Sequence, residues 1–284
     1  RVLFRSMRET GVIETVAKHN AFSLRRLLAR HMARTAGKTV MSPENSRQIA
    51  RKRMDAGADR LPTPDDVHIE TTEISGLSAL TFTPDDRRPG LLLFLHGGGY
   101  CLGSAKSHRP LVTRLAKGLR IKAVSVDYRL APEHVFPCAV DDGAAALNWT
   151  MSQSDGPVLI AGDSAGGNLV AAVAHHARGR LEGILGQVLI YPDLGGDLNQ
   201  PSYTEHAQAP LLGTDAVRGY RSLRHGGAMP TDDPTAAPLQ DSDFAGLPPT
   251  VLFSADCDPL RDEARVYRDR LRAAGGTVCW VNET

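Results

Sequence analysis

The sequence lacks several features that would place it in a specialised class of protein. Its four cysteines, Cys101, Cys138, Cys257 and Cys279, stand far apart in 284 residues, and no C-x-x-C pair occurs. Such spacing favours free thiols in a reducing compartment over a disulfide scaffold or a zinc site. The formal net charge is only +1, so we expect no nucleic-acid or strongly acidic partner.

Long apolar runs are also missing. No run approaches the roughly 18 apolar residues of a membrane span, and the N-terminus lacks the apolar core of a signal peptide. We therefore expect a cytoplasmic protein without a membrane span. The hydrophobic fraction of 42% is sufficient for one large domain with a sizeable core.

Both ends of the chain are unusual. Residues 1–6 precede Met7, and we interpret them as a leader that is not native. At the other end, an apolar run at 277–281 is followed only by Asn-Glu-Thr284. A natural chain rarely stops just after a strand that looks buried, so we expect a truncated strand–helix end.

Residues 7–60 have a helical and basic pattern, which we assign to an N-terminal cap segment. Ser42-Pro43-Glu44 supplies an N-cap, a first-turn proline and a first-turn acid, so a helix is expected from there to Gly57. The basic side chains between Arg25 and Arg53 have two interpretations: a solvated helix face, which we favour, or a membrane-surface patch.

Residues 61–284 alternate between strand and helix patterns, which indicates an α/β core. A linker and two edge strands come first; the expected strands are 67–72, 77–83, 91–95, 121–126, 158–161, 187–191, 250–254 and 277–281. The expected helices are 107–119, 138–153, 168–178 and 260–274. This alternation predicts a mostly parallel sheet with helices on both faces. Residues 195–248 hold no strand pattern and one helix pattern at 214–225, so we assign about 195–225 to a cap insertion.

The central motif is Gly162-Asp-Ser-Ala-Gly166, which fits G-x-S-x-G. An apolar strand precedes it and an alanine-rich helix follows it, which is the context of a nucleophile elbow. In such a turn small residues flank the serine, and its Oγ is exposed above the sheet at a helix N-terminus. We therefore expect Ser164 to be a catalytic nucleophile.

A second glycine-rich motif, His96-Gly-Gly-Gly-Tyr100, follows the strand at 91–95. A nucleotide-binding interpretation fails, because Leu102 stands where G-x-G-x-x-G needs its third glycine and no G-K-[ST] occurs. Glycines do let backbone N–H groups approach a developing oxyanion. We expect an oxyanion hole from two of Gly97, Gly98 and Gly99, with Gly98 and Gly99 favoured, and from the amide of Ala165. The structural alternative is a plain glycine-rich turn.

Asp258 follows the strand at 250–254 and precedes a helix, which places it at the carboxyl edge of the sheet, where ligands bind in such folds. The alternative is a helix N-cap before Pro259. Asp262 is a weaker candidate acid, one turn into the helix.

Five motifs in one order identify a family resemblance: the two above, Tyr128-Arg-Leu-Ala-Pro-Glu-His134, Leu247-Pro-Pro249 and Asp258-Pro-Leu-Arg-Asp262. The chain resembles the hormone-sensitive-lipase-like branch of the α/β-hydrolases, the carboxylesterases with an HGGG motif, over about residues 40–284. The resemblance implies that Ser164 is the nucleophile and Asp258 the triad acid, with His96 and Asp163 as supporting motif residues. We expect structural roles for Arg129, Glu133 and His134.

The base of the triad is missing from the sequence. The order in this fold is Ser, Asp, His, yet the last histidine is His225. His175 and His176 lie about 16 Å up the helix from Ser164, which is out of reach. His206 and His225, in the expected cap, stay open. We expect the base within about five residues after Thr284.

These residues predict a serine carboxylesterase that acts through an acyl-enzyme without metal or organic cofactor. The resemblance implies short- to medium-chain acyl esters. Two rivals are a receptor that has lost its base and holds a small ligand, and an amidase or formamidase with the same triad. If the last strand is a sheet edge, a second copy could pair with it to form a homodimer.

Overall fold

The computed structural model describes residues 44–230 and 232–283. Its central sheet has eight strands: β1 (Val67–Ile74), β2 (Leu77–Pro84), β3 (Leu91–Leu95), β4 (Lys122–Val126), β5 (Val158–Asp163), β6 (Ile184–Ile190), β7 (Thr250–Ala255) and β8 (Val278–Glu283). Their order is β1-β2-β4-β3-β5-β6-β7-β8. Strand β2 runs antiparallel to both of its neighbours, β1 and β4, whereas the pairs from β4 to β8 are parallel, which confirms the mostly parallel sheet.

The strand patterns follow burial. All residues of β3 and β5 are buried, as continuous apolar runs covered on both faces should be. Strand β1 is largely exposed between its two buried ends and forms one edge of the sheet. The expectation that 77–83 is a second edge strand is wrong, because β2 lies between β1 and β4 and buries Phe82 in the core.

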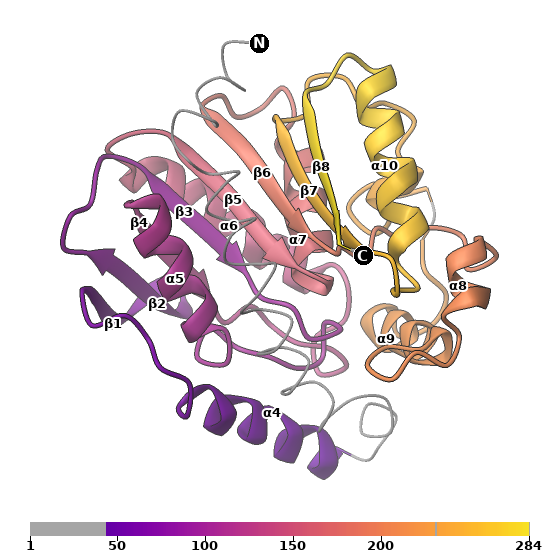
Figure 1. Cartoon of the computed structure of the whole chain (residues 1–284), viewed down its shortest axis with the longest axis horizontal. Helices are drawn as coiled ribbons and strands as arrows, with labels where there is room; N and C mark the ends of the chain where they lie inside the picture. The colour runs from indigo at the N-terminus through magenta and orange to yellow at the C-terminus, as the bar shows by residue number, and fades with distance from the viewer. Residues whose placement is uncertain (1–43, 231, 284) are drawn as a thin grey trace.

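Helices cover both faces of the sheet (Figure 1). Helix α5 (Arg109–Leu119) packs in the cluster on one face, and α6 (Cys138–Gln153), α7 (Ala165–Ala177) and α10 (Arg261–Ala273) pack in the cluster on the other. Helix α7 begins at Ala165 and not at Asn168 as expected, because the chain turns into the helix directly after Ser164. Within the described residues no helix is long and apolar enough to cross a membrane.

Three further helices lie near the carboxyl ends of the central strands: α4 (Glu44–Ala58), α8 (Pro201–Glu205) and α9 (Thr214–His225) (Figure 1). The short helix α8 and the 3₁₀ turn η2 (Pro238–Gln240) were not expected; both are too brief to show a helical period. Helix α4 packs through Ala50 and Met54 against Cys101, Leu102 and partly buried Tyr220. Most of the expected cap segment, residues 7–43, lies outside the described residues.

Candidate active site

Ser164 occupies a sharp turn between β5 and α7. Its backbone has φ 52° and ψ −119°, a conformation that side chains rarely adopt and that clusters at functional sites. The flanking glycines allow the turn: a Cβ on Gly166 would lie 2.0 Å from the carbonyl oxygen of Leu95, and one on Gly162 would lie 2.4 Å from that of Gly166. Ser164 is partly exposed while its neighbours are buried. This is the geometry of a nucleophile elbow.

The loop after β3 presents free N–H groups beside Ser164. The Gly97 N–H donates to Asp163 Oδ1 at 2.9 Å, which leaves it unavailable as an oxyanion donor. In contrast, the N–H groups of Gly98, Gly99 and Ala165 donate to no acceptor among the described residues. These three residues line one pocket together with Ser164. The candidates for the oxyanion hole therefore narrow to Gly98, Gly99 and Ala165.

Asp163 joins the elbow to this loop and is buried with a histidine partner. His108 Nε2 lies 3.4 Å from Asp163 Oδ1, and both side chains are 4% exposed. Burial favours the neutral form of Asp163, but the His108 charge outweighs it and lowers the pKa of that carboxyl. His108 belongs to no motif, so its place beside Asp163 could not be predicted from the sequence.

His96 has a packing role in the same cluster. Its ring stacks on Tyr128, with centroids 4.3 Å apart, and on His108 at 5.4 Å. The Tyr128 hydroxyl donates to the His96 carbonyl at 2.7 Å. Burial and the neighbouring His108 lower the pKa of His96 to about 3, so its ring is neutral near pH 7.

Asp258 is the more suitable of the two candidate acids. It is partly buried, and its Oδ1 accepts the Leu260 N–H at 2.8 Å. Burial raises its pKa to about 6, and in residues 44–230 and 232–283 no cation pairs with it. Asp262 is already engaged: it pairs with Arg261 and Arg265 and accepts the Ser202 N–H. A desolvated carboxylate without a cation is a candidate to hold a proton donor.

None of the described histidines hydrogen-bonds to Ser164 or Asp258. His175 lies between Asp241 at 2.6 Å and the Tyr267 hydroxyl at 3.0 Å, inside the core. His206 approaches Glu205 and Arg261. His225 packs against Phe136, with ring centroids 5.3 Å apart.

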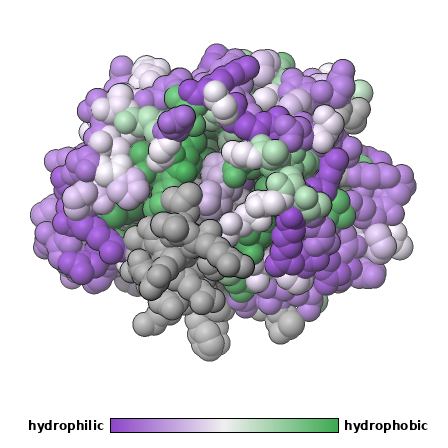
Figure 2. Space-filling model, turned by 90° about the horizontal axis from the view of Figure 1, so that it is seen from above, coloured by the Kyte–Doolittle hydropathy of each residue, from purple (hydrophilic) through white to green (hydrophobic). Residues whose placement is uncertain are grey.

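The pocket above Ser164 is mostly apolar. Its space is about 570 Å³, including the part open to solvent. Met54 comes from α4 and Val217 and Tyr220 from α9, and further apolar side chains of the wall are those of Leu102, Leu212 and Leu260. The molecule seen from above has apolar patches inside a hydrophilic periphery (Figure 2). Such a pocket fits a ligand with an apolar body and one reactive polar group.

The family profile described as alpha/beta hydrolase fold matches residues 92–283. The chain belongs to this family. The match includes Ser164, Asp258 and the glycine-rich loop, and it confirms the fold expected from the motifs.

Relatives place the chain in the hormone-sensitive-lipase-like branch. It is 39% identical over 204 residues to the carboxylesterase NlhH of Mycobacterium tuberculosis, covering 68% of this chain and 64% of that protein's length. It is 30% identical to an ethyl acetate hydrolase of Pseudomonas putida, over 86% of this chain and 83% of that one. A crystal structure of an esterase from the bacterial hormone-sensitive lipase family superposes with a TM-score of 0.79 at 30% identity, covering 91% and 88% of the two chains.

Two further motif residues, Arg129 and Glu133, make structural contacts. Arg129 pairs with Asp142 at 2.7 Å. Glu133 pairs with Arg51 of α4 at 2.9 Å, so this arginine contributes to packing rather than to a free basic face. The four cysteines form no disulfide with one another, in agreement with their spacing.

Proposed function

We propose that this α/β-hydrolase is a serine carboxylesterase that cleaves short- to medium-chain acyl esters through an acyl-enzyme on Ser164. The observation that carries the proposal is the strained, partly exposed Ser164, which faces a pocket together with three backbone N–H groups that have no acceptor among the described residues. A tetrahedral oxyanion is the ligand that such an arrangement suits.

In the acylation step, Ser164 Oγ attacks the acyl carbon of the ester and loses its proton to a general base. The carbonyl oxygen becomes an oxyanion that accepts hydrogen bonds from the N–H groups of Gly98, Gly99 and Ala165. The tetrahedral intermediate then collapses: the bond between the acyl carbon and the alkoxy oxygen breaks, the base gives its proton to the leaving alcohol, and the acyl group stays on Ser164 Oγ. Loss of one donor of this kind typically costs about 3 kcal/mol of transition-state stabilisation.

We propose that the base is a histidine after Thr284. Strand β8 runs parallel to β7, and the Asp256 N–H donates to the Glu283 carbonyl at 2.8 Å. The chain that leaves β8 therefore emerges at the sheet edge that carries Asp258. Asp258, desolvated and without a cation, would accept the imidazole N–H, orient the ring and stabilise its charged form.

Deacylation repeats the sequence with water. The histidine takes a proton from the water molecule, the resulting hydroxide attacks the acyl carbon, and Ser164 leaves with the proton returned to it. The residues involved supply all proton transfers, so this mechanism requires no metal or organic cofactor.

The pocket wall supports the proposed class of acyl ester. Met54, Leu212, Val217 and Leu260 offer apolar contact to an acyl chain. The name of the Pseudomonas relative, ethyl acetate hydrolase, agrees with a small ester. The cytoplasmic location, the lack of a nucleic-acid partner and the homodimer through β8 stay predictions.

Hydrolysis of a p-nitrophenyl ester series from acetate to dodecanoate tests the proposal. Two chains are compared: this one, and one extended through its natural C-terminus. We expect turnover by the extended chain, strongest on the short esters, and a loss of kcat by a factor of about 10⁴ or more in Ser164→Ala.

Two results would contradict the proposal. An extended chain that is inert on every ester but binds small apolar ligands would favour the receptor. Faster cleavage of an amide than of the matched ester would favour the amidase or formamidase.

A further inference from the structure

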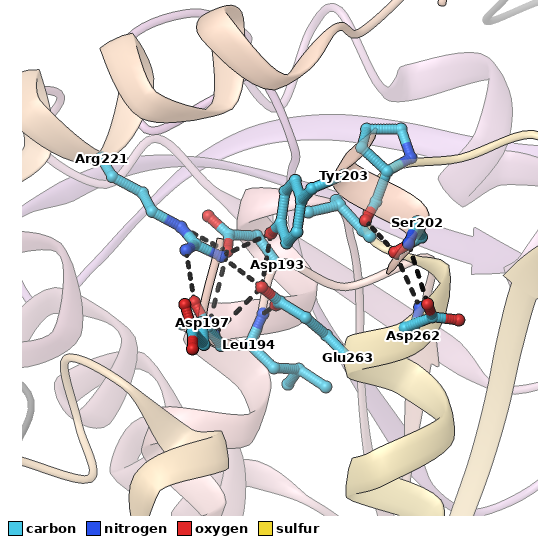
Figure 3. A network of polar contacts seen from close by, with 12 residues as sticks. Asp193, Leu194, Asp197, Ser202, Tyr203, Arg221, Asp262 and Glu263 are labelled. Atoms are coloured by element: carbon cyan, nitrogen blue, oxygen red, sulfur yellow. Dashed lines mark hydrogen bonds and ion pairs between the residues drawn. The ribbon is translucent and has the colours of Figure 1, made fainter. Parts of the chain in front are cut away.

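A buried ion network joins the cap helix α9 to the catalytic core (Figure 3). At its centre is Arg221, which is 6% exposed. Its guanidinium donates to Asp193 Oδ1 and to Glu263 Oε1, each at 2.5 Å, and to the Gly196 carbonyl at 2.8 Å. The proposed mechanism does not use this network, although Asp193 lines the pocket that contains Ser164.

The network reaches the oxyanion loop by two contacts. The Tyr100 hydroxyl donates to Asp193 Oδ2 at 2.9 Å, and Tyr100 directly follows Gly99. On α9 itself, Tyr220 packs on Gly99 so closely that a Cβ there would lie 2.1 Å from its ring. Arg221 is thus linked to Tyr100 through Asp193, and it directly follows Tyr220, whose ring packs on Gly99.

The network also reaches the Asp258 side. Glu263 is fully buried on α10, and its carboxylate accepts the N–H groups of Leu194 and Gly196 at 2.7 and 3.0 Å. The Ser202 hydroxyl donates at 2.7 Å to the carbonyl of Pro259, the residue next to Asp258. The cap is therefore hydrogen-bonded to the segments that carry both halves of the site.

We propose that Arg221 is a positioning residue, which sets the Gly98 and Gly99 N–H groups for the oxyanion through Asp193–Tyr100 and through Tyr220. This inference rests on the proposed esterase function. The alternative is that Arg221 only holds the cap closed over the substrate.

The two roles differ in kinetics. Oxyanion donors act on the transition state more than on the bound ester, so their misplacement lowers kcat and leaves KM nearly constant. A loosened cap that served binding alone would raise KM and leave kcat unchanged.

The test uses p-nitrophenyl butyrate and the chain extended through its natural C-terminus. We expect Arg221→Lys to lower kcat at least tenfold, because an ammonium group cannot bridge two carboxylates with a planar fork, and to change KM less than threefold. Tyr100→Phe removes one hydrogen bond with little change in volume, and we expect a kcat loss of about fivefold.

The matched control is Arg178→Lys. Arg178 also pairs with an aspartate, Asp241, at 3.2 Å, but it follows the C-terminus of α7, about 20 Å along the axis from Ser164. We expect its kcat to stay within twofold of the parent. The melting temperature of each variant is recorded, so that a loss of folded protein is separated from a loss of kcat.

Hydrogen exchange of the peptide 97–103, measured by mass spectrometry, gives a readout without turnover. We expect faster exchange in Arg221→Lys and Tyr100→Phe and no change in Arg178→Lys. Unchanged kcat and exchange in the two network variants, or a rise in KM alone, would overturn the inference. If the parent hydrolyses no ester but the exchange pattern appears, the proposed esterase function fails while the coupling of Arg221 to the loop stands.

Discussion

Two aspartates of the candidate site, Asp163 and Asp258, have opposite electrostatic surroundings. Asp163, buried in the elbow, accepts the Gly97 N–H and lies 3.4 Å from the buried His108. Asp258, at the other side of the site, accepts one N–H, from Leu260, and pairs with no cation in the described parts of the chain. The pKa of Asp163 is lowered, and that of Asp258 is raised to about 6.

This difference separates a structural aspartate from one available for catalysis. Asp163 has its partners already, so its charge stabilises the fold and fixes the oxyanion loop against the elbow. Asp258 carries the cost of desolvation without a compensating ion pair, which natural proteins usually retain only where a function needs it. The two carboxylates should therefore respond oppositely to substitution and to pH.

The largest effect is expected from Asp163→Ala. It leaves the buried His108 without its counter-charge and frees the Gly97 N–H, so we expect a loss of about 3 kcal/mol in the free energy of unfolding. Urea unfolding at pH 7 measures it. Asp163→Asn, which keeps an acceptor for Gly97, should lose less, and Asp258→Ala should lose little. Equal losses from Asp163→Ala and Asp258→Ala would contradict the assignment of a structural role to Asp163 alone.

The contribution of the His108–Asp163 pair to the free energy of unfolding should depend on pH. Burial alone lowers the pKa of His108, but Asp163 outweighs it and raises the pKa above its usual 6.5. The folded state therefore binds this proton more tightly than the unfolded state. The resulting stabilisation is complete below about pH 6.5 and is lost as the pH rises through the folded-state pKa.

The measurement is the unfolding free energy of the parent and of His108→Gln between pH 5.5 and 9. We expect the difference between them to shrink toward high pH. His68→Gln is the matched control, because His68 pairs with Asp85 at 2.9 Å on the surface, where it is 74% exposed, and such pairs contribute little. A constant difference across this range would show that the pKa of His108 is the same in the folded and unfolded states, and a difference that grows toward high pH would show that His108 is neutral in the fold.

The elbow and the parallel sheet could be predicted from the sequence because their signals are local. A continuous apolar run, a glycine-flanked serine and an alanine-rich helix follow one another directly, and the structure has β5, Ser164 and α7 there. The expected bounds of 138–153 and 214–225 are those of α6 and α9. Periodicity and turn chemistry are sufficient for elements of this length.

Partners that meet only through the fold could not be predicted. His108 stands 55 positions before Asp163 and belongs to no motif, so nothing in the sequence pairs them. Arg221 and Arg224 have the pattern of a solvated helix face, yet both are buried. One signal in the sequence could have indicated a buried partner for these arginines: residues 256–263 contain more acidic side chains than one catalytic aspartate requires.

The smallest expected change in the free energy of unfolding comes from substitution of Asp258, and it is a gain, whereas substitution of Asp163 causes a loss. Its pKa is raised from 3.8 to about 6, so the folded state favours the neutral carboxyl and loses stability as the pH rises through 6. Asp258→Asn should therefore raise the unfolding free energy of this chain by about 1 kcal/mol at pH 8, after allowance for solvent screening, and by only about half as much at pH 5, which lies between the unfolded-state and folded-state pKa values.

Asp262→Asn is the matched control four residues away. Burial opposes its ionisation, but hydrogen bonds from Arg261 outweigh this and lower its pKa, so its loss should destabilise at pH 8.

The decisive comparison repeats Asp258→Asn in the chain extended through its natural C-terminus. A histidine that donates to Asp258 would compensate the buried charge, and the gain at pH 8 would disappear together with esterase activity. If the gain persists there unchanged, no base has reached Asp258, and its assignment as the triad acid fails.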